Sequence, residues 1–435
     1  MCKRYFISFL GVTDYKPTIY YTDGYRDNEP EKYIQISTIR YLKIDEWEDN
    51  DEIIILMTEK SKQSNWLGNN GLKQRINQLG LRCTVKDILI PAGNQENDLW
   101  QIYYTILTHI DDYAELYIDI THSFRSLPML FTVILHQLNN LKNVKIKSIT
   151  YGNHESRNQN NESPIIDLTL FSSIMDIIDF THQTKKFGFS FDKENVIERL
   201  LKDLGNKYKG HNNLHNSIRE FFSLISNFSK FIYYCNAPEL INGDILRRIH
   251  QDYNQIMTSN DDDPLLNTLK QLCIALFHDL NQVFELSVRQ NILNDDRNLL
   301  YAARYCAKHF LYQQGFTFLQ EGLKNIFRNK YLKIYESKLI INDNSRQDIQ
   351  IFDFISSFLN HGNKNENTWK GILLDNKDVA IDLRNRGIID NRLFGLYSKI
   401  TESRNKINHA HLGGNYSNKY DEILQQYISE VFSIF

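Results

Sequence analysis

The stretch from Glu115 to Leu130 constrains the fold more than any other part of the chain. It reads ELYIDITHSFRSLPML. Apolar side chains alternate with others over residues 115–120, which predicts a β-strand that ends near Thr121. Pro128 falls in the first turn of an apolar segment with helical periodicity. The polar residues in between therefore lie at a strand-to-helix corner, as in proteins with parallel sheets.

This corner has the chemistry of an anion site. The first N–H groups of a helix have no partner within the helix, and the positive end of its dipole points the same way. Such a corner holds a phosphate or a ribose in many α/β proteins. The predicted ligand contacts are Asp119, Thr121, His122, Ser123, Arg125 and Ser126. One alternative stays open, in which Asp119 and Thr121 only cap a turn and Arg125 is a surface cation.

The composition indicates a globular protein of two or three domains. The chain has 435 residues, of which 42% are hydrophobic and 24% are charged, enough to form separate cores. The formal net charge is −3, so any binding of nucleic acid needs a local basic patch. This argues against a protein that coats DNA non-specifically.

Cysteine usage and hydropathy favour a cytoplasmic protein. The cysteines are scattered and form no C-x-x-C pair, which argues against disulfides and a cysteine zinc site. They are Cys2, Cys83, Cys235, Cys273 and Cys306. The apolar run at the N-terminus is too short for a signal peptide, and no uncharged run reaches the ~18 residues of a membrane span. We therefore expect no membrane segment.

Strands and helices alternate up to residue 171. Strands are expected at residues 4–10, 53–57, 81–90, 115–121, 144–151 and 165–170, and helices at 65–79 and 98–113. The continuous apolar strand at 53–57 is typical of a parallel sheet that is covered on both faces. We predict an α/β domain with a doubly wound, Rossmann-like sheet of about six strands.

Two more polar corners are expected at the carboxyl edge of this sheet. One follows the strand at 4–10 and the other follows the strand at 53–57. Parallel strands end at the same edge, so both corners should lie beside Thr121. The predicted ligand contacts are Gly11, Thr13, Asp14 and Tyr15 in the first corner, and Thr58 and Lys60 in the second. Taken alone, the glycine corner is equally consistent with an ordinary turn.

These corners resemble the CARF domains of CRISPR-associated proteins. The segment DITHSFRS matches their D-x-T-H-G/S signature at Asp119, Thr121, His122 and Ser123. Residues 9–11 and Tyr15 match a second corner of the family, which reads F-L-G-T-G-x-Y, although Asp14 replaces a small residue there. The resemblance implies a Rossmann-like sensor of a cyclic oligoadenylate. It favours cyclic tetraadenylate, while the residues themselves do not fix the ring size.

Beyond residue 171, helical periodicity continues to the C-terminus. We predict three domains, 1–171, 172–293 and 294–435, of which the middle one is a helical connector without an evident role. Within it, Asp263 followed by Pro264 predicts the start of a helix. His211 and His215 have the spacing of a helical metal pair, but no third ligand is in view, and we expect no metal and no cofactor.

The last domain carries a second motif. We predict one helix from Asp390 to His411, with Arg404 and His409 near its end. These two residues, with the polar Asn405 after the arginine, resemble the R-x4-6-H motif of HEPN ribonucleases. The segment 301–327 resembles the opening helix pair of the same helical bundle.

Two alternatives bear on this motif. Arg304 and His309 have the same spacing, but they lie in the opening helix pair, whereas the family motif lies late in the domain. Residues 404–411 also fit a solvated basic helix end that complements the helix dipole.

Residue types suggest roles for the predicted catalytic residues Arg404, Asn405 and His409. RNA supplies its own 2′-OH nucleophile, so His409 as acid/base and Arg404 as stabiliser of phosphate charge need no metal. Positions five apart on a helix diverge by about 140°, so Arg404 and His409 cannot face one small substrate together. Asn405 and His409 do share a face. The family pools the motifs of two chains across a two-fold axis.

The two resemblances together imply an accessory ribonuclease of type III CRISPR antiviral defence. A cyclic oligoadenylate would switch it on, and it would cut single-stranded RNA to 2′,3′-cyclic phosphate ends. The implied protein is a homodimer able to assemble further, with no stable association with the CRISPR effector complex. Two other classes remain: a ligand-sensing transcription regulator that uses residues 172–293 on DNA, and a ring nuclease that degrades the cyclic ligand.

Overall fold

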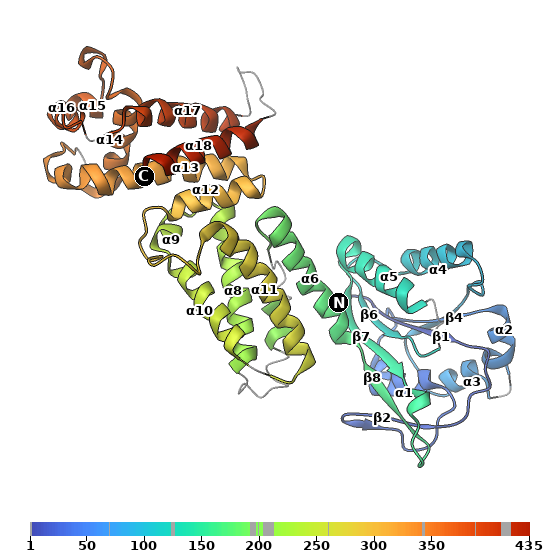
Figure 1. Ribbon diagram of the computed structural model, residues 1–435. Coiled ribbons are helices and arrows are strands. Elements are labelled where there is room, and N and C mark those ends of the chain that lie inside the picture. Colours follow the sequence, from blue (N-terminus) through green and yellow to red (C-terminus); the bar gives the residue numbers. More distant parts are fainter. Residues whose placement is uncertain are drawn as a thin grey trace. The chain divides into compact units, whose positions relative to one another are not determined.

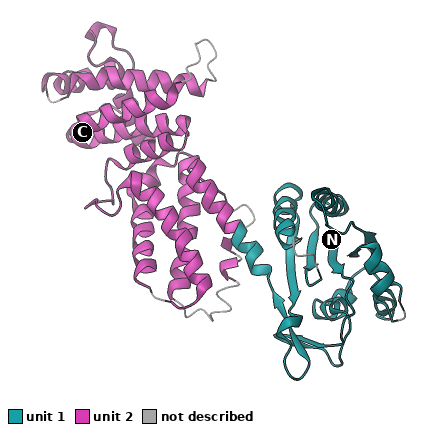
Figure 2. Ribbon diagram, turned by 45° about the vertical axis from the view of Figure 1, so that its right-hand side comes forward, with its two compact units in different colours: residues 1–175 teal, residues 176–435 magenta. Residues whose placement is uncertain are grey.

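The computed structural model divides into two compact units, Met1–Met175 and Asp176–Phe435 (Figure 2). It describes residues 2–68, 70–122, 127–191, 197–198, 200–202, 213–259, 261–341, 344–387, 389–409 and 419–435. The further division of the helical part at residue 293 stays a prediction.

The first unit is built on an eight-stranded sheet of order β3-β2-β8-β7-β6-β1-β4-β5. The strands are β1 Arg4–Leu10, β2 Ile19–Thr22, β3 Tyr25–Arg26, β4 Glu52–Met57, β5 Thr84–Leu89, β6 Glu115–Asp119, β7 Lys145–Gly152 and β8 Glu162–Asp167. Strands β1, β4, β5, β6 and β7 are parallel, and β8 is antiparallel to β7. Each of the six predicted strands overlaps an observed one, although β8 begins and ends three residues before the predicted range of 165–170. The sheet has two more, β2 and β3, which pair as a hairpin around Gly24.

Helices cover both faces of this sheet (Figure 1). They are α1 Ile34–Tyr41, α2 Glu59–Ser61, α3 Leu72–Asn77, α4 Glu96–His109 and α5 Leu127–Lys142, with the 3-10 turns η1 Ile44–Glu46 and η3 His154–Ser156. α4 and α5 pack on one face, whereas α1 and α3 pack on the other. Strand β1 contributes to both cores, with Phe9 in the first and Leu10 in the second, because successive side chains of a strand point to opposite faces. The predicted doubly wound α/β sheet is therefore confirmed.

The single helix predicted at residues 65–79 was wrong. The chain forms a π-helical segment η2, Lys62–Trp66, and then the separate helix α3. Gly71 precedes α3, and a Cβ atom there would lie 2.5 Å from the carbonyl oxygen of Trp66. The backbone therefore returns on itself at a position that only glycine fits.

The second unit is helical throughout the part that the structure describes. Helix α6 Thr169–Phe187 leads into it, and the further helices are α8 Asn213–Tyr233, α9 Ala237–Asn242, α10 Asp244–Thr258, α11 Pro264–Phe284, α12 Asn298–Lys308, α13 Tyr312–Phe327, α14 Gln347–His361, α15 Ile372–Asp375, α16 Lys377–Asn385, α17 Asn391–Asn408 and α18 Tyr420–Ile434. Short 3-10 or π segments are η4 Arg328–Leu332, η5 Lys333–Lys338, η6 Asn344–Arg346 and η7 Glu366–Thr368. None of the helices within the described ranges has the length and apolar content needed to cross a bilayer.

Side-chain caps mark two of the helix starts that the sequence predicted. The Asp263 carboxylate accepts hydrogen bonds from the N–H groups of Leu265 at 2.8 Å and Leu266 at 3.2 Å, at the start of α11. The Asp390 carboxylate caps α17 in the same way. Helix α17 ends at Asn408 with His409 as its C-cap, and the predicted end at His411 lies outside the described residues.

Two glycines bring neighbouring helices close to α13. A Cβ atom at Gly315 would lie 2.5 Å from Leu424 of α18, and one at Gly322 would lie 3.0 Å from Leu300 of α12. Helix α17 also packs against α13, through Gln320, whose side-chain amide donates to Thr401 at 2.8 Å. The helix that carries the second motif thus lies in a bundle with α12, α13 and α18.

Candidate functional site

Three predicted corners meet at the carboxyl edge of the sheet. Strand β1 lies between β6 and β4. After β1 and the β2–β3 hairpin, the chain forms β4 and β5 on one side of β1 and then β6 and β7 on the other. The ends of β1 and β6 therefore form a topological switch point. Gly11 follows β1, Thr58 follows β4, and the DITH segment ends β6. Ligands of open α/β sheets bind at such a point.

Asp119 is a buried structural carboxylate. It is fully inaccessible to solvent. Its Oδ2 atom accepts from the Ser8 hydroxyl of β1 at 2.6 Å, and Oδ1 accepts from the Thr121 hydroxyl at 2.5 Å and the Thr121 N–H at 3.2 Å. Burial raises the pKa of Asp119, and these hydrogen bonds oppose the rise. Asp119 therefore links the ends of β1 and β6.

Thr121 connects β6 to the next strand. Its hydroxyl donates to Asp119 and accepts from the N–H of Gly152, at the end of β7, at 2.8 Å. A Cβ atom at Gly152 would lie 2.6 Å from Ile34 and 3.3 Å from the Thr121 hydroxyl, so glycine permits this approach. The side chain positions the corner, as in the alternative that treats Thr121 as part of a turn.

The first corner packs directly on His122. The Tyr15 ring stacks on the imidazole with 4.2 Å between ring centroids and 29° between the planes. The Tyr15 hydroxyl accepts from the N–H of Gly11 at 2.7 Å. Burial, with a smaller contribution from His154, lowers the pKa of His122 to about 4, so its ring is neutral near pH 7. Among the described residues, the buried Nε2 atom of His122 has no hydrogen-bond partner.

Asn65, in the π-helical segment that follows the second corner, holds the first corner in place. Its side-chain amide donates to the carbonyl oxygens of Gly11 at 3.0 Å and Thr13 at 2.9 Å. Asn65 lies in the π-helical segment, and it is buried. No motif in the sequence singles out this residue, because its role depends on a contact across more than fifty positions.

The remaining predicted contacts of the first two corners differ in exposure. Thr58 caps α2 through a capping box with Ser61, so its hydroxyl serves the backbone. Lys60 and Asp14 are exposed, and Asp14 lies 3.3 Å from Lys32. Ser123, Arg125 and Ser126 lie outside the described residues. His154, after β7, was not predicted, although it contributes to the lowered pKa of His122.

Arg404 of the second motif lines a pocket of about 430 Å³ in the helical unit. The pocket is formed by the end of α8, the start of α13 and the end of α17. Its main lining residues are Tyr233, Tyr234, Gln313, Gln314, Arg404 and Asn408. The guanidinium Nε atom is buried and has no hydrogen-bond partner in the part of the chain that the structure describes. Arg404 and Asn408 are four positions apart and therefore share one helix face.

Asn405 and His409 do not line this pocket. Both side chains are exposed, and the backbone N–H of His409 donates to the carbonyl oxygen of Asn405 at 2.9 Å. The structure thus brings Arg404 together with Asn408 rather than with the two other predicted catalytic residues. Sequence reasoning missed Asn408, although its spacing from Arg404 was a usable signal.

The second R-x4-H match has a structural role. Arg304 pairs with Glu285 at 3.2 Å and lies over the Phe432 ring at 4.2 Å. His309 is buried, with its Nε2 atom 3.2 Å from Asp279. Both side chains therefore make contacts within the bundle.

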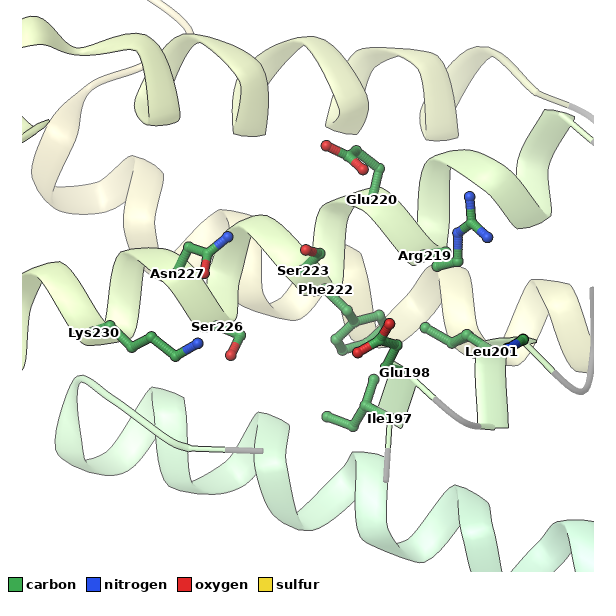
Figure 3. A pocket seen from close by; sticks show the side chains of 11 residues that line it. Ile197, Glu198, Leu201, Arg219, Glu220, Phe222, Ser223, Ser226, Asn227 and Lys230 are labelled. Carbon is green, nitrogen blue, oxygen red and sulfur yellow. The ribbon is translucent and has the colours of Figure 1, made fainter. Parts of the chain in front are cut away.

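Another pocket, of about 590 Å³, lies along the middle of α8. Figure 3 shows Ser223, Asn227 and Lys230 on one helix, with Ile197 and Glu198 on a separate segment across the opening. Its charged residues have both signs, and one of them, Glu220, already pairs with Arg248. The lining thus combines opposite charges and does not select one class of ligand.

The described residues contain no group of three or more His, Cys, Asp or Glu side chains arranged to hold a metal ion. His215 is buried in α8, where its Nε2 atom lies 2.6 Å from the carbonyl oxygen of Leu201. His211, the other half of the histidine pair, lies outside the described residues.

The chain is similar to one curated protein over part of its length. Across 131 residues it is 28% identical to the CRISPR-associated protein MJ1674 of Methanocaldococcus jannaschii, a match that covers 29% of this chain and 20% of that protein. The chain thus spans only about a fifth of that relative. No protein-family model matches. This relative is a CRISPR-associated protein, the class of protein that the DITHSFRS segment resembles.

Among solved structures, Enterococcus italicus Csm6 bound to cyclic hexa-2′-fluoro-hexa-dAMP aligns with 99% of this chain and 93% of its own. The TM-score of this alignment is 0.42 and the sequence identity is 13%.

Proposed function

We propose that the chain senses a cyclic oligoadenylate with its N-terminal unit and cuts single-stranded RNA with its helical unit, as part of CRISPR antiviral defence. The observation that carries the proposal is the carboxyl edge of the sheet, where the Gly11–Tyr15 corner stacks on His122 beside the turn of Asp119 and Thr121. The signature residues support the ligand class, and the similarity to a CRISPR-associated protein supports the setting.

Within this proposal, the signature residues divide into two groups. Asp119 and Thr121 position the corner after β6, because Asp119 accepts from Ser8 and Thr121 accepts from Gly152. His122 offers a neutral ring nitrogen to the ligand. Ser123, Arg125 and Ser126 precede α5, where a phosphate is favoured by the helix N-terminus and by a guanidinium.

The proposed RNA chemistry needs only proton transfer and charge stabilisation. His409 removes the proton from the 2′-OH, whose oxygen attacks the adjacent phosphorus while the bond to the 5′-oxygen breaks. The leaving 5′-oxygen takes a proton from the protonated His409 or from water, and the products carry a 2′,3′-cyclic phosphate and a 5′-hydroxyl. Arg404 stabilises the charge on the phosphate oxygens in the transition state, and Asn405 orients the imidazole.

A cleavage assay in EDTA tests this function. The full chain is mixed with single-stranded RNA and with cyclic tri-, tetra- or hexaadenylate. We expect cleavage with one ring size, with 2′,3′-cyclic phosphate ends. His409→Ala and Arg404→Ala should abolish cleavage but still bind the ring, whereas Lys399→Ala, an exposed cation on the same helix, should leave both unchanged. If chelator removes all activity and a divalent ion restores it, the metal-independent mechanism is wrong.

A further inference from the structure

We propose that the pocket beside Arg404 is a subsite for one nucleotide of the single-stranded RNA substrate, in which a base stacks on Tyr234 and an adjacent phosphate faces Arg404. The inference rests on the proposed ribonuclease function. It assigns a role to the end of α8, in the middle segment for which the sequence suggested none. The volume of about 430 Å³ lies within the range of small-ligand sites.

The aromatic wall of this pocket is held in place before any ligand arrives. Tyr234 is 71% exposed, although tyrosine is a large side chain, and its ring lies 5.3 Å from that of Tyr233. Tyr233 is in turn held by Phe189 at 5.0 Å and Phe191 at 5.1 Å. An exposed aromatic ring on a fixed support is the usual platform for an unpaired base.

The end of α8 presents both tyrosines at the pocket. Cys235 has a left-handed backbone with φ of 54°. The N–H of Asn236 donates to the carbonyl oxygen of Phe231 at 2.9 Å, and the N–H of Cys235 donates to Ile232 at 3.3 Å. This pair of hydrogen bonds is a Schellman motif, which ends the helix sharply. The last turn of α8 therefore projects its two rings next to α13 and α17.

The polar wall suits a nucleotide. Gln313 and Gln314, in the first turn of α13, carry amide groups that donate and accept hydrogen bonds, as base edges require. Arg404 brings a positive charge whose buried Nε has no partner among the described residues. Burial raises the pKa of the Cys235 thiol to about 11, and Arg404 opposes this rise. The wall therefore combines a cation with neutral groups, which favours a phosphate next to a base.

Binding of an uncleavable RNA tests the subsite apart from catalysis. Fully 2′-O-methylated single-stranded RNA lacks the 2′-OH nucleophile, so its affinity for the full chain can be measured by fluorescence anisotropy with the ring ligand present. We expect Tyr234→Ala to weaken binding roughly 5- to 100-fold, the usual effect of losing one stacked base. Tyr234→Phe should bind like wild type. Tyr104→Ala, an equally exposed tyrosine on α4, serves as the matched control and should have no effect.

A scan with abasic oligonucleotides identifies the stacked base. At one position, removal of the base should weaken wild-type binding and abolish the difference between wild type and Tyr234→Ala, because the two changes remove the same contact. Equal affinities of wild type and Tyr234→Ala, or an equal loss in Tyr104→Ala, would overturn the subsite. If the binding results hold while wild type cuts no RNA with any ring ligand, the ribonuclease proposal fails instead.

Discussion

At the scale of single residues, the carboxyl edge of the sheet is held together by the hydrogen bonds of Asp119 and Thr121. The Thr121 hydroxyl has one proton to donate, which goes to Asp119, and it accepts from the N–H of Gly152. The adjacent ring of His122 is held by stacking on Tyr15 instead. Positioning of the corner and the proposed ligand contact therefore fall to different side chains.

Replacing Thr121 should lower both stability and ligand affinity. Thr121→Ala leaves the Gly152 N–H without its acceptor and removes one donor from the buried Asp119, so the free energy of unfolding of the N-terminal unit should fall by about 1–3 kcal/mol. Binding of cyclic oligoadenylate should weaken because the loop after β6 loses its anchor. Thr121→Ser keeps the hydroxyl and is the control. Urea unfolding and calorimetry would measure the two effects, and unchanged values for Thr121→Ala would contradict this role.

The stability of the first unit should depend on pH through His122. Burial lowers the pKa of His122 from its ordinary value of 6.5 to about 4. Above pH ~6.5 both folded and unfolded chains carry a neutral ring, whereas between about 6.5 and 4 only the unfolded chain takes up a proton. Acidification over this window should therefore destabilise the fold, by at most ~1.4 kcal/mol per pH unit.

A His122→Gln variant isolates this effect. Asp119 has the opposite effect, because its pKa is raised in the folded chain and stability therefore falls as the pH rises through that pKa. This effect is common to wild type and the His122→Gln variant. We expect the variant to lose less stability than wild type when the pH is lowered from 6.5 to 4. Parallel curves of unfolding free energy against pH would show that the folded ring titrates normally.

At the scale of whole elements, local signals predicted where many strands and helices begin and end. Strand β1 runs over residues 4–10, as its apolar run predicted. Asp263 and Pro264 marked the start of α11, because a side-chain carboxylate and a proline both suit the first turn of a helix. The helix that carries Arg404 begins next to Asp390, whose carboxylate accepts from the N–H of Arg392. Such signals act within a few residues and can be read without the fold.

Contacts between distant elements could not be predicted in this way. The break at Gly71 in the helix predicted at residues 65–79 depends on the close approach of the backbone to Trp66. The Asn65 contacts depend on β1 and β4 lying side by side. The pocket at Arg404 combines residues from α8, α13 and α17, with Tyr233 and Asn408 175 positions apart, so no spacing rule indicates it. Motif matching therefore found Arg404 but not Tyr234.

The cap of α11 gives a test at this scale. Asp263→Ala removes the acceptor of two N–H groups at the start of a long, partly buried helix, and it should lower the free energy of unfolding by about 0.5–2 kcal/mol. Asp263→Asn keeps a capping oxygen and should cost much less. Thermal unfolding of the full chain would measure the difference. Equal stabilities of the alanine and asparagine variants would show that the cap contributes nothing.

At the scale of the whole molecule, the divergence of Arg404 and His409 on one helix bears on how an active site is assembled. Arg404 faces the pocket, while His409 is exposed at the helix end. A site pooled between two chains would unite them, and a two-fold symmetric ring ligand would match the axis of such a dimer. The ligand could then act by shifting how the two chains pack.

A heterodimer of wild type with an Arg404→Ala/His409→Ala double mutant tests pooling. If both chains contribute to every catalytic centre, RNA cleavage by the purified heterodimer should fall well below half of the wild-type rate. Wild-type homodimers carrying the same two purification tags provide the reference. Retention of half the activity would show that each chain works independently.

The two outer strands of the sheet limit how copies of the chain can associate. Strand β3 is only two residues long. Strand β5 carries Lys86 and Asp87, which pair with Glu52 at 2.9 Å and Lys62 at 2.8 Å. Unpaired backbone groups at a sheet edge recruit strands from other chains, and short or charged edges resist this recruitment. Both margins of the sheet are thus protected against edge-to-edge pairing with strands of other chains.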